Sequence, residues 1–185
     1  MSQEILSESE KAALLKIARS TIKSALLGEK QEAPYSFCKI FESKMSCFVT
    51  LHGRDGNLRG CIGNIQAFEP LVDNVKANAL NSAFRDPRFR PLKEDELDSI
   101  NIEISVLTPP VPIKDYKEIE VGRHGIILQK GSRSSVFLPQ VATEQGWDLE
   151  TTLCHLSMKA GMGAYDWKDA KTKFSVFEAV VFSEK

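Results

Sequence analysis

The sequence lacks the features that would place this protein in a membrane, among disulfide-stabilised secreted domains, or on nucleic acid. No apolar run approaches the ~20 residues of a membrane-spanning helix, and residues 1–10 are polar and acidic, unlike a signal peptide. The four cysteines include no Cys-x-x-Cys pair and, with the three histidines, fit no zinc-site spacing. The formal charge of −1 provides no overall attraction for nucleic acid or anionic lipid. We therefore expect a cytoplasmic protein with free thiols, without a metal or a cofactor.

Nucleotide-binding signatures and internal repeats are also absent. No Walker-type phosphate loop occurs, and the glycines at 60 and 63 do not have the spacing of the dinucleotide fingerprint. What the chain does have is an ordinary globular composition, with 42% hydrophobic and 26% charged residues. A chain of 185 residues can bury roughly 70% of its unfolded surface, so it needs no disulfide or metal for stability. We expect a single α+β domain.

An amphipathic helix is predicted between Ser7 and Gly28. Ser7 and Glu10 have the spacing of a capping box, and Gly28 suits the position just after a helix C-terminus. Apolar residues recur at helical spacing between them. These are Leu14, Leu15, Ala18, Ile22, Ala25 and Leu26.

The remaining pattern alternates strands and helices. We expect a helix after Pro70, strands at 100–106, 126–129 and 134–138, two short helices between 139 and 161, and a final strand at 174–182. Asn74, Asn78 and Asn81 in the helix after Pro70 face either solvent or a cleft, and solvent is the expected environment. The proline-rich segment 108–112 is the best candidate for an internal boundary. Because residues 174–182 are apolar on both faces, we expect one central strand there and not two tandem domains.

Residues 47–52 and 58–62 predict a β-hairpin around a turn that contains two glycines. The register that aligns the apolar residues of both strands pairs Gly53 with Leu58. The side chains on the other face are then those of Phe48, Thr50, His52, Arg59 and Cys61. An imidazole, a guanidinium and a thiol would share one face of this ribbon.

The second strand of this hairpin, with the sequence LRGCIG at 58–63, is the predicted functional centre. Glycine weakens a strand interior, so two glycines in six residues require another explanation. Glycine is useful where the backbone bends or where another group approaches it closely. Gly60 and Gly63 are therefore candidates for contact with a ligand.

Residues 84–92 alternate three arginines with two phenylalanines, and two prolines among them predict an extended loop. One interpretation is an anion pocket built from guanidiniums, with Arg85 and Arg88 as candidates. A second is a basic, aromatic patch for nucleic acid, which the near-neutral net charge disfavours. The third, and the main expectation, is that Asp86 pairs with Arg85 or Arg88 while the phenylalanines join the core.

Several motifs together resemble the AMMECR family. They lie at residues 48–52, 58–63, 83–89, 102–107, 124–126, 137–142, 146–147 and 159–161, and thus cover nearly the whole chain. The chain departs from the family pattern at Ser134 or Ser135 and at Ser157 with Met158. These departures put shared chemistry at those positions in doubt and leave 58–63 intact.

The resemblance implies an α+β protein with an antiparallel sheet and flanking helices. A larger lobe of about 1–108 with 172–185 would hold both termini, and a smaller inserted lobe would span about 109–171. A cleft between them would be lined by 58–63. Family members occur beside, or fused to, Memo-like proteins and radical S-adenosylmethionine proteins, which implies a shared pathway.

Two functional hypotheses follow. The first is a module that binds a small ligand or a protein partner, with Arg59 supplying charge and Cys61 only packing. Its ligand-binding residues would be Arg59, Gly60, Gly63, Arg85, Asp86, Arg88 and Gln140, the last from the family motif.

The alternative is an enzyme in which Cys61 attacks a small anionic substrate as a thiolate, with His52 or His124 as base. A nearby cation lowers a thiol pKa from about 8.5, and Arg59 would supply that charge. Whether the protein is an enzyme stays open.

Overall fold

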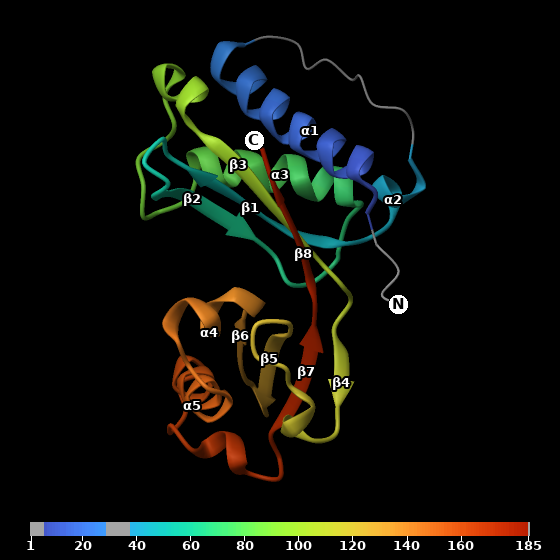
Figure 1. Cartoon of the computed structure of the whole chain (residues 1–185), viewed down its shortest axis with the longest axis vertical. Coiled ribbons are helices and arrows are strands. Elements are labelled where there is room, and N and C mark those ends of the chain that lie inside the picture. Colours follow the sequence, from blue (N-terminus) through green and yellow to red (C-terminus); the bar gives the residue numbers. More distant parts are fainter. Residues whose placement is uncertain (1–5, 29–37, 185) are drawn as a thin grey trace. The chain divides into compact units, whose positions relative to one another are not determined.

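The computed structural model describes residues 6–28 and 38–184, and the chain separates into two compact units (Figure 1). The first unit contains Met1–Leu107 and Val180–Lys185, and the second contains Thr108–Ala179. The lobe boundaries predicted from the sequence lie at about 108/109 and 171/172. The first agrees with the observed boundary to within one residue, and the second lies eight residues before the observed one. Residues 173–177 were assigned to the larger lobe, but they pair within the sheet of the second unit.

The first unit is a four-stranded sheet with helices packed on it. The strand order is β2-β1-β3-β8, with β1 Ser46–His52, β2 Leu58–Gly63, β3 Asn101–Leu107 and β8 Ala179–Ser183. The helices are α1 Glu8–Leu27, α2 Lys39–Glu42, α3 Leu71–Phe84 and the 3₁₀ helix η1 Glu94–Ser99. β1 pairs antiparallel with both β2 and β3. α3 packs against β1 and β2, and α1 packs against α3 and β3.

The predicted N-terminal helix is confirmed as α1, including both of its ends. The Ser7 N–H donates to the Glu10 carboxylate at 2.7 Å, and the Ser7 hydroxyl accepts from the Glu10 N–H, which completes the capping box. Gly28 ends the helix with φ 66°, a left-handed conformation that costs glycine little.

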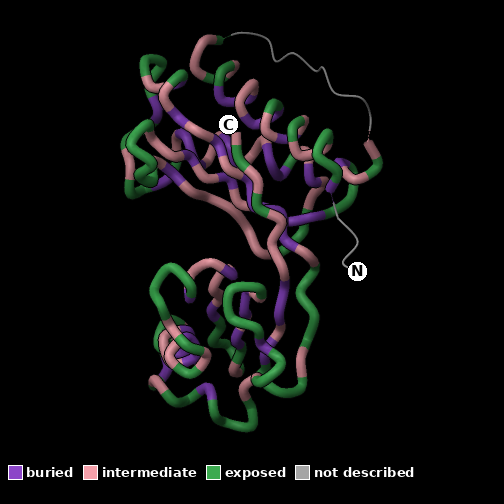
Figure 2. The backbone as a smooth tube through the Cα atoms, viewed as in Figure 1, coloured by how far each residue is buried: buried purple, intermediate pink, exposed green. Residues whose placement is uncertain are grey.

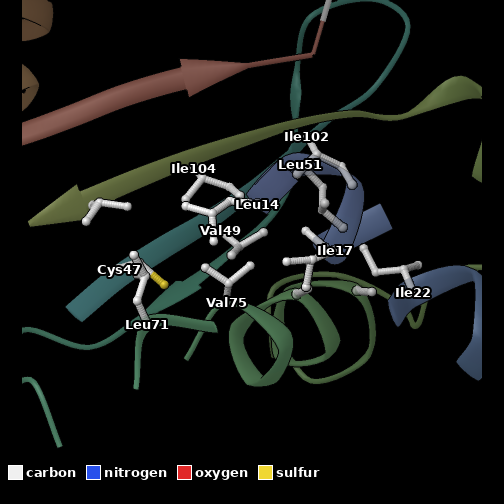
Figure 3. Close-up of a cluster of buried hydrophobic side chains, with 14 of the residues drawn as sticks. Leu14, Ile17, Ile22, Cys47, Val49, Leu51, Leu71, Val75, Ile102 and Ile104 are labelled. Carbon is white, nitrogen blue, oxygen red and sulfur yellow. The ribbon is translucent and has the colours of Figure 1, made fainter. Parts of the chain in front are cut away.

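The core of the first unit lies between the helices and one face of the sheet (Figure 3). Along β1, the residues Cys47, Val49 and Leu51 are completely buried, whereas their neighbours Phe48, Thr50 and His52 are only half-buried. This alternation follows from the two-residue repeat of a strand. Residues 54–57, in the hairpin turn that follows β1, are exposed (Figure 2).

The second unit is another four-stranded sheet, with the order β4-β7-β5-β6. Its strands are β4 Val111–Ile113, β5 Gly125–Lys130, β6 Arg133–Phe137 and β7 Lys173–Phe177. Its helices are α4 Pro139–Gln145, α5 Leu149–Lys159, η2 Tyr116–Glu118 and η3 Asp166–Lys168. Its core includes Leu128, Leu153, Leu156 and Trp167. His155 stacks on Trp147 with ring centroids 4.0 Å apart.

The predicted α+β class is confirmed, with two antiparallel sheets flanked by helices. The prediction of one central strand over 174–182 is wrong, because β7 ends at Phe177 and β8 begins at Ala179 in the other sheet. At this break, Glu178 and Thr108 exchange hydrogen bonds of 2.8 and 2.9 Å. A continuous apolar run does not reveal a one-residue break between strands. Among residues 6–28 and 38–184, no helix is long and apolar enough to cross a membrane.

Candidate functional site

A row of polar side chains on α3 holds the strands that carry the LRGCIG segment. The Asn74 side-chain oxygen accepts the Cys47 N–H at 3.2 Å, and the Asn78 amide donates to the Cys47 carbonyl at 3.2 Å. The two asparagines are 1% and 5% exposed, so the expectation that they face solvent is wrong. Because residues four apart share one face of a helix, Asn74, Asn78 and Ser82 all face the strands.

Ser82 connects the two strands of the hairpin directly. Its hydroxyl donates to the Val49 carbonyl at 2.6 Å and accepts the Ile62 N–H at 2.9 Å. Gly60 permits this close approach, since a Cβ added there would lie 2.2 Å from the Ser82 carbonyl oxygen. A Cβ at Gly63 would lie 2.3 Å from the Phe48 ring. Contacts within the chain thus account for both glycines, and a ligand contact at either one stays a prediction.

The loop after α3 fixes the peptide group of Cys61. The Asp86 carboxylate accepts the Cys61 N–H at 2.9 Å, while Arg88 Nη2 donates to the Cys61 carbonyl at 3.3 Å. Arg88 also donates through Nε and Nη2 to both Asp86 oxygens, at 3.0 and 2.7 Å. The Asp86 side chain is 1% exposed and that of Arg88 is 55% exposed. Hydrogen bonding from Arg88 lowers the pKa of Asp86 well below its ordinary value. The predicted pairing of Asp86 with one of its neighbouring arginines is therefore confirmed for Arg88.

The Cys61 thiol lies beside two polar residues of the neighbouring strands. Thr50 is its cross-strand partner, and the Thr50 hydroxyl donates to the Cys61 sulfur at 3.2 Å. Glu103 is the partner of Thr50 on the opposite side, so a thiol, a hydroxyl and a carboxylate residue form one row across the sheet. The alternation of residues 100–106 indicates that the Glu103 side chain points away from the core. Only the pairing of β3 with β1 places Glu103 in the same row as Cys61.

A β-bulge alters the predicted hairpin register at Arg59. Val49 pairs with Ile62 and Leu51 with Gly60, as the apolar pattern predicted. The register then shifts between Leu51 and His52, so that His52 lies opposite Leu58. The predicted pairing of Gly53 with Leu58 is therefore wrong, because the bulge adds one residue to β2.

Arg59 is held by η1 instead. Its Nε and Nη2 donate to the Glu96 carboxylate at 2.8 and 3.0 Å. This bidentate pair lowers the pKa of Glu96 below its ordinary value. The residues that Arg59 contacts differ from those around Cys61, and the guanidinium that bonds the Cys61 backbone belongs to Arg88.

A pocket of about 380 Å³ opens beside Arg59. Its lining residues are Arg59, Phe89, Arg90, Pro91, Lys93, Asp95 and Glu96. Within residues 6–28 and 38–184, Arg59 Nη1 is the one buried side-chain nitrogen or oxygen without a hydrogen-bond partner. An unpartnered buried donor of this kind requires an explanation.

The other predicted site residues are dispersed. Arg85 is exposed, and among the residues that the structure describes its guanidinium bonds only the Asn81 side-chain oxygen, at 3.4 Å. His124 and Gln140 belong to the second unit, where His124 Nδ1 accepts the Glu120 N–H at 3.0 Å. Their predicted roles beside Cys61 or Arg59 stay predictions. No group of three or more His, Cys, Asp or Glu residues in the described parts of the chain could hold a metal ion.

Comparison with known proteins places this geometry in a family. The AMMECR1 family model matches residues 15–182. The chain belongs to the AMMECR1 family. It is 43% identical to a protein of Methanothermobacter thermautotrophicus over 97% of this chain and 96% of that protein. It is 40% identical to Protein NEQ441 of Nanoarchaeum equitans over 92% of this chain and 98% of that protein.

The AMMECR1 fold is also represented among solved structures. The crystal structure of uncharacterized protein PH0010 from Pyrococcus horikoshii matches with a TM-score of 0.85 and 37% identity. The match covers 98% of this chain and 94% of that chain. The names of these AMMECR1-like proteins state no activity or ligand, so the function has to be argued from the site.

Proposed function

We propose that this AMMECR1-family chain is a binding module for a small organic anion, held in the pocket beside Arg59. The observation that carries the proposal is the buried Arg59 Nη1, which has no partner within the described residues although its other two nitrogens bond Glu96. Leaving a buried donor unpaired costs about 1–3 kcal/mol. An anionic oxygen that reached Nη1 from the pocket would remove that cost.

The other charges at the pocket support an anion. Arg90 and Lys93 line it, are exposed, and make no ion pair within residues 6–28 and 38–184. Their charges are less compensated than that of Arg59, which Glu96 binds directly, although the Lys93 charge also acts on Glu96. Arginine and lysine are also the side chains that bind carboxylates and phosphates most directly.

The size and walls of the pocket support an organic ligand. Its volume of about 380 Å³ lies within the ~300–1,000 Å³ that is common for small-molecule sites. Phe89 and Pro91 add apolar surface to the lining. Small-molecule sites typically combine such walls with a few polar groups that fix orientation.

Benzoate and its neutral analogue benzamide test this proposal on the ¹⁵N-labelled full chain. Benzoate is expected to shift backbone amide signals of residues 89–96, and benzamide to leave them unchanged. The double substitution R90Q/K93Q should weaken benzoate binding two- to thirty-fold, since each exposed charge contact contributes roughly 0.2–1 kcal/mol. The double variant R54Q/R85Q removes two exposed arginines outside the pocket and should bind like the wild type. Equal shifts with benzamide, or none with benzoate, would refute the proposal.

A second candidate function, thiolate chemistry at Cys61, has one specific observation in its favour. The Cys61 sulfur accepts a hydrogen bond from Thr50, and the Arg88 guanidinium bonds the carbonyl of the same residue. A hydroxyl donor and a nearby cation both stabilise a thiolate. Removal of the donor by Thr50→Val should then slow alkylation of Cys61 by iodoacetamide, as followed by mass spectrometry. An unchanged rate would leave Cys61 as a packing residue.

A further inference from the structure

The charges around Arg59 allow the ligand to be described more narrowly, and this step rests on the proposed function. We infer that the pocket selects a carboxylate with a single negative charge, attached to a small apolar group. The inference comes from the balance of charged side chains in the lining, the hydrogen bonds of Arg59, and the position of Phe89.

The lining carries one positive charge in excess. Arg59 and Glu96 neutralise each other through their bidentate contact. The remaining charged residues of the lining are the cations Arg90 and Lys93 and the carboxylate of Asp95. Asp95 makes no ion pair in the part of the chain that the structure describes. One added negative charge balances the pocket, whereas two would leave it negative.

This balance matters because an anionic oxygen that bonds the buried Arg59 Nη1 would give up part of its hydration. The cost of desolvating an ion rises with the square of its charge, while the attraction to a given set of cations rises only in proportion. A phosphate dianion therefore has a higher desolvation cost per unit charge than a carboxylate, while its attraction per unit charge to the same cations is equal. With only one excess positive charge in the lining, the monoanion is favoured.

The hydrogen bonds of Arg59 are consistent with a second carboxylate on the same guanidinium. Glu96 occupies Nε and Nη2, which leaves Nη1 as the nitrogen without a partner. A guanidinium has five N–H donors, so it can bond two carboxylates at once. Glu96 is held in place by a further bond, because it also accepts the Lys93 N–H at 2.9 Å.

The apolar part of the ligand would meet Phe89 and Pro91. The Arg88 guanidinium lies 5.4 Å from the centroid of the Phe89 ring, within cation–π range. Because Arg88 is also bonded to Asp86, the ring has a fixed neighbour. A flat hydrocarbon group is the chemistry that such a ring and a proline accommodate best.

The test compares benzoate with phenyl phosphate on the full chain at about pH 8, where a phosphate monoester with a second pKa of roughly 6 is a dianion. Both are titrated while the amide signals of residues 89–96 are followed. Benzoate should bind more tightly to the wild type. Asp95→Asn removes one negative charge from the pocket, which raises its net charge by one. The substitution should shift the affinity ratio toward phenyl phosphate by about two- to five-fold. Asp98→Asn makes the same charge change outside this lining and should leave the ratio unaltered.

The outcomes separate this inference from the function beneath it. Tighter binding of phenyl phosphate to the wild type, or an unchanged ratio in Asp95→Asn, overturns the choice of a monoanion and leaves anion binding intact. Absence of shifts with both compounds overturns the proposed function itself, and the present inference with it. A ratio that moves equally in Asp98→Asn shows that the effect is not local to the pocket and also overturns the inference.

Discussion

The Asp86 carboxylate accepts the backbone N–H of Cys61 at 2.9 Å, and this bond ties β2 to the loop after α3. β2 is an edge strand of its sheet, so this N–H has no neighbouring strand to bond. Arg88 bonds the Cys61 carbonyl in the same way. An edge strand with unpaired backbone groups is open to pairing with other chains. Here side chains of the same unit satisfy both groups of Cys61.

The first prediction concerns acid stability and Asp86. Because its pKa is lowered in the folded state by Arg88, the carboxylate stabilises the fold above the unfolded-state pKa of about 3.9. That contribution is lost as the pH falls toward the lower, folded-state pKa. Urea unfolding at about pH 7 and pH 3 should therefore show a smaller acid-induced loss of stability for Asp86→Asn than for the wild type. Asp95→Asn, an exposed control, should resemble the wild type. Equal losses in all three proteins would contradict the prediction.

The second prediction tests the close approach at Gly60. A Cβ there would meet the Ser82 backbone oxygen at 2.2 Å, so α3 or β2 would have to move. Gly60→Ala should lower the free energy of unfolding by about 1–3 kcal/mol, as overpacked cores do. In Gly53→Ala the nearest atom to the new Cβ is Asp55 Oδ1, a side-chain atom of the exposed turn, at 3.0 Å, and the loss should be smaller. The measurement is urea denaturation, and equal losses would refute the explanation.

The third prediction concerns the Ser82 hydroxyl. Its removal in Ser82→Ala leaves the Val49 carbonyl and the Ile62 N–H without that bridge. The expected loss of stability is about 1–3 kcal/mol, with faster amide hydrogen exchange at Ile62. Ser20→Ala serves as the control, since within residues 6–28 and 38–184 the Ser20 hydroxyl bonds only the Ile17 carbonyl of its own helix. Unchanged exchange at Ile62 would show that the bridge does not hold β2.

The fourth prediction ranks three of the thiols by reactivity. Burial raises the pKa of Cys47 to about 12, and a hydrogen bond to Glu10 raises the pKa of Cys38. Only the thiolate reacts with alkylating agents, so Cys61 should be labelled faster than Cys38 at neutral pH, and Cys47 last. Slower labelling of Cys61 would remove the support for thiolate chemistry.

Much of the fold could be read from local patterns. The capping box and Gly28 marked both ends of α1, and the apolar alternation predicted the pairing of Val49 with Ile62. These signals involve residues that are close in sequence or joined by a short turn. The bulge at Arg59 was not predicted, because one extra residue near a turn leaves the apolar pattern almost unchanged.

The polar contacts of the site were harder to predict. Asn74 and Asn78 read as solvated, since a buried amide needs partners that the sequence does not reveal. Those partners are the backbone of β1, whose position under α3 is a property of the folded unit. Glu103 was missed for the same reason.

The sequence by itself determined the family, the α+β class and the presence of the hairpin that ends in LRGCIG. Only the tertiary structure decided that Arg59 meets Glu96, 37 positions away, and that Cys61 meets Asp86, 25 positions away. Periodicity and turn chemistry act over a few neighbouring residues. The partner of a buried polar group depends instead on strand order and on how closely a helix approaches its sheet, and these arise only when the whole unit packs.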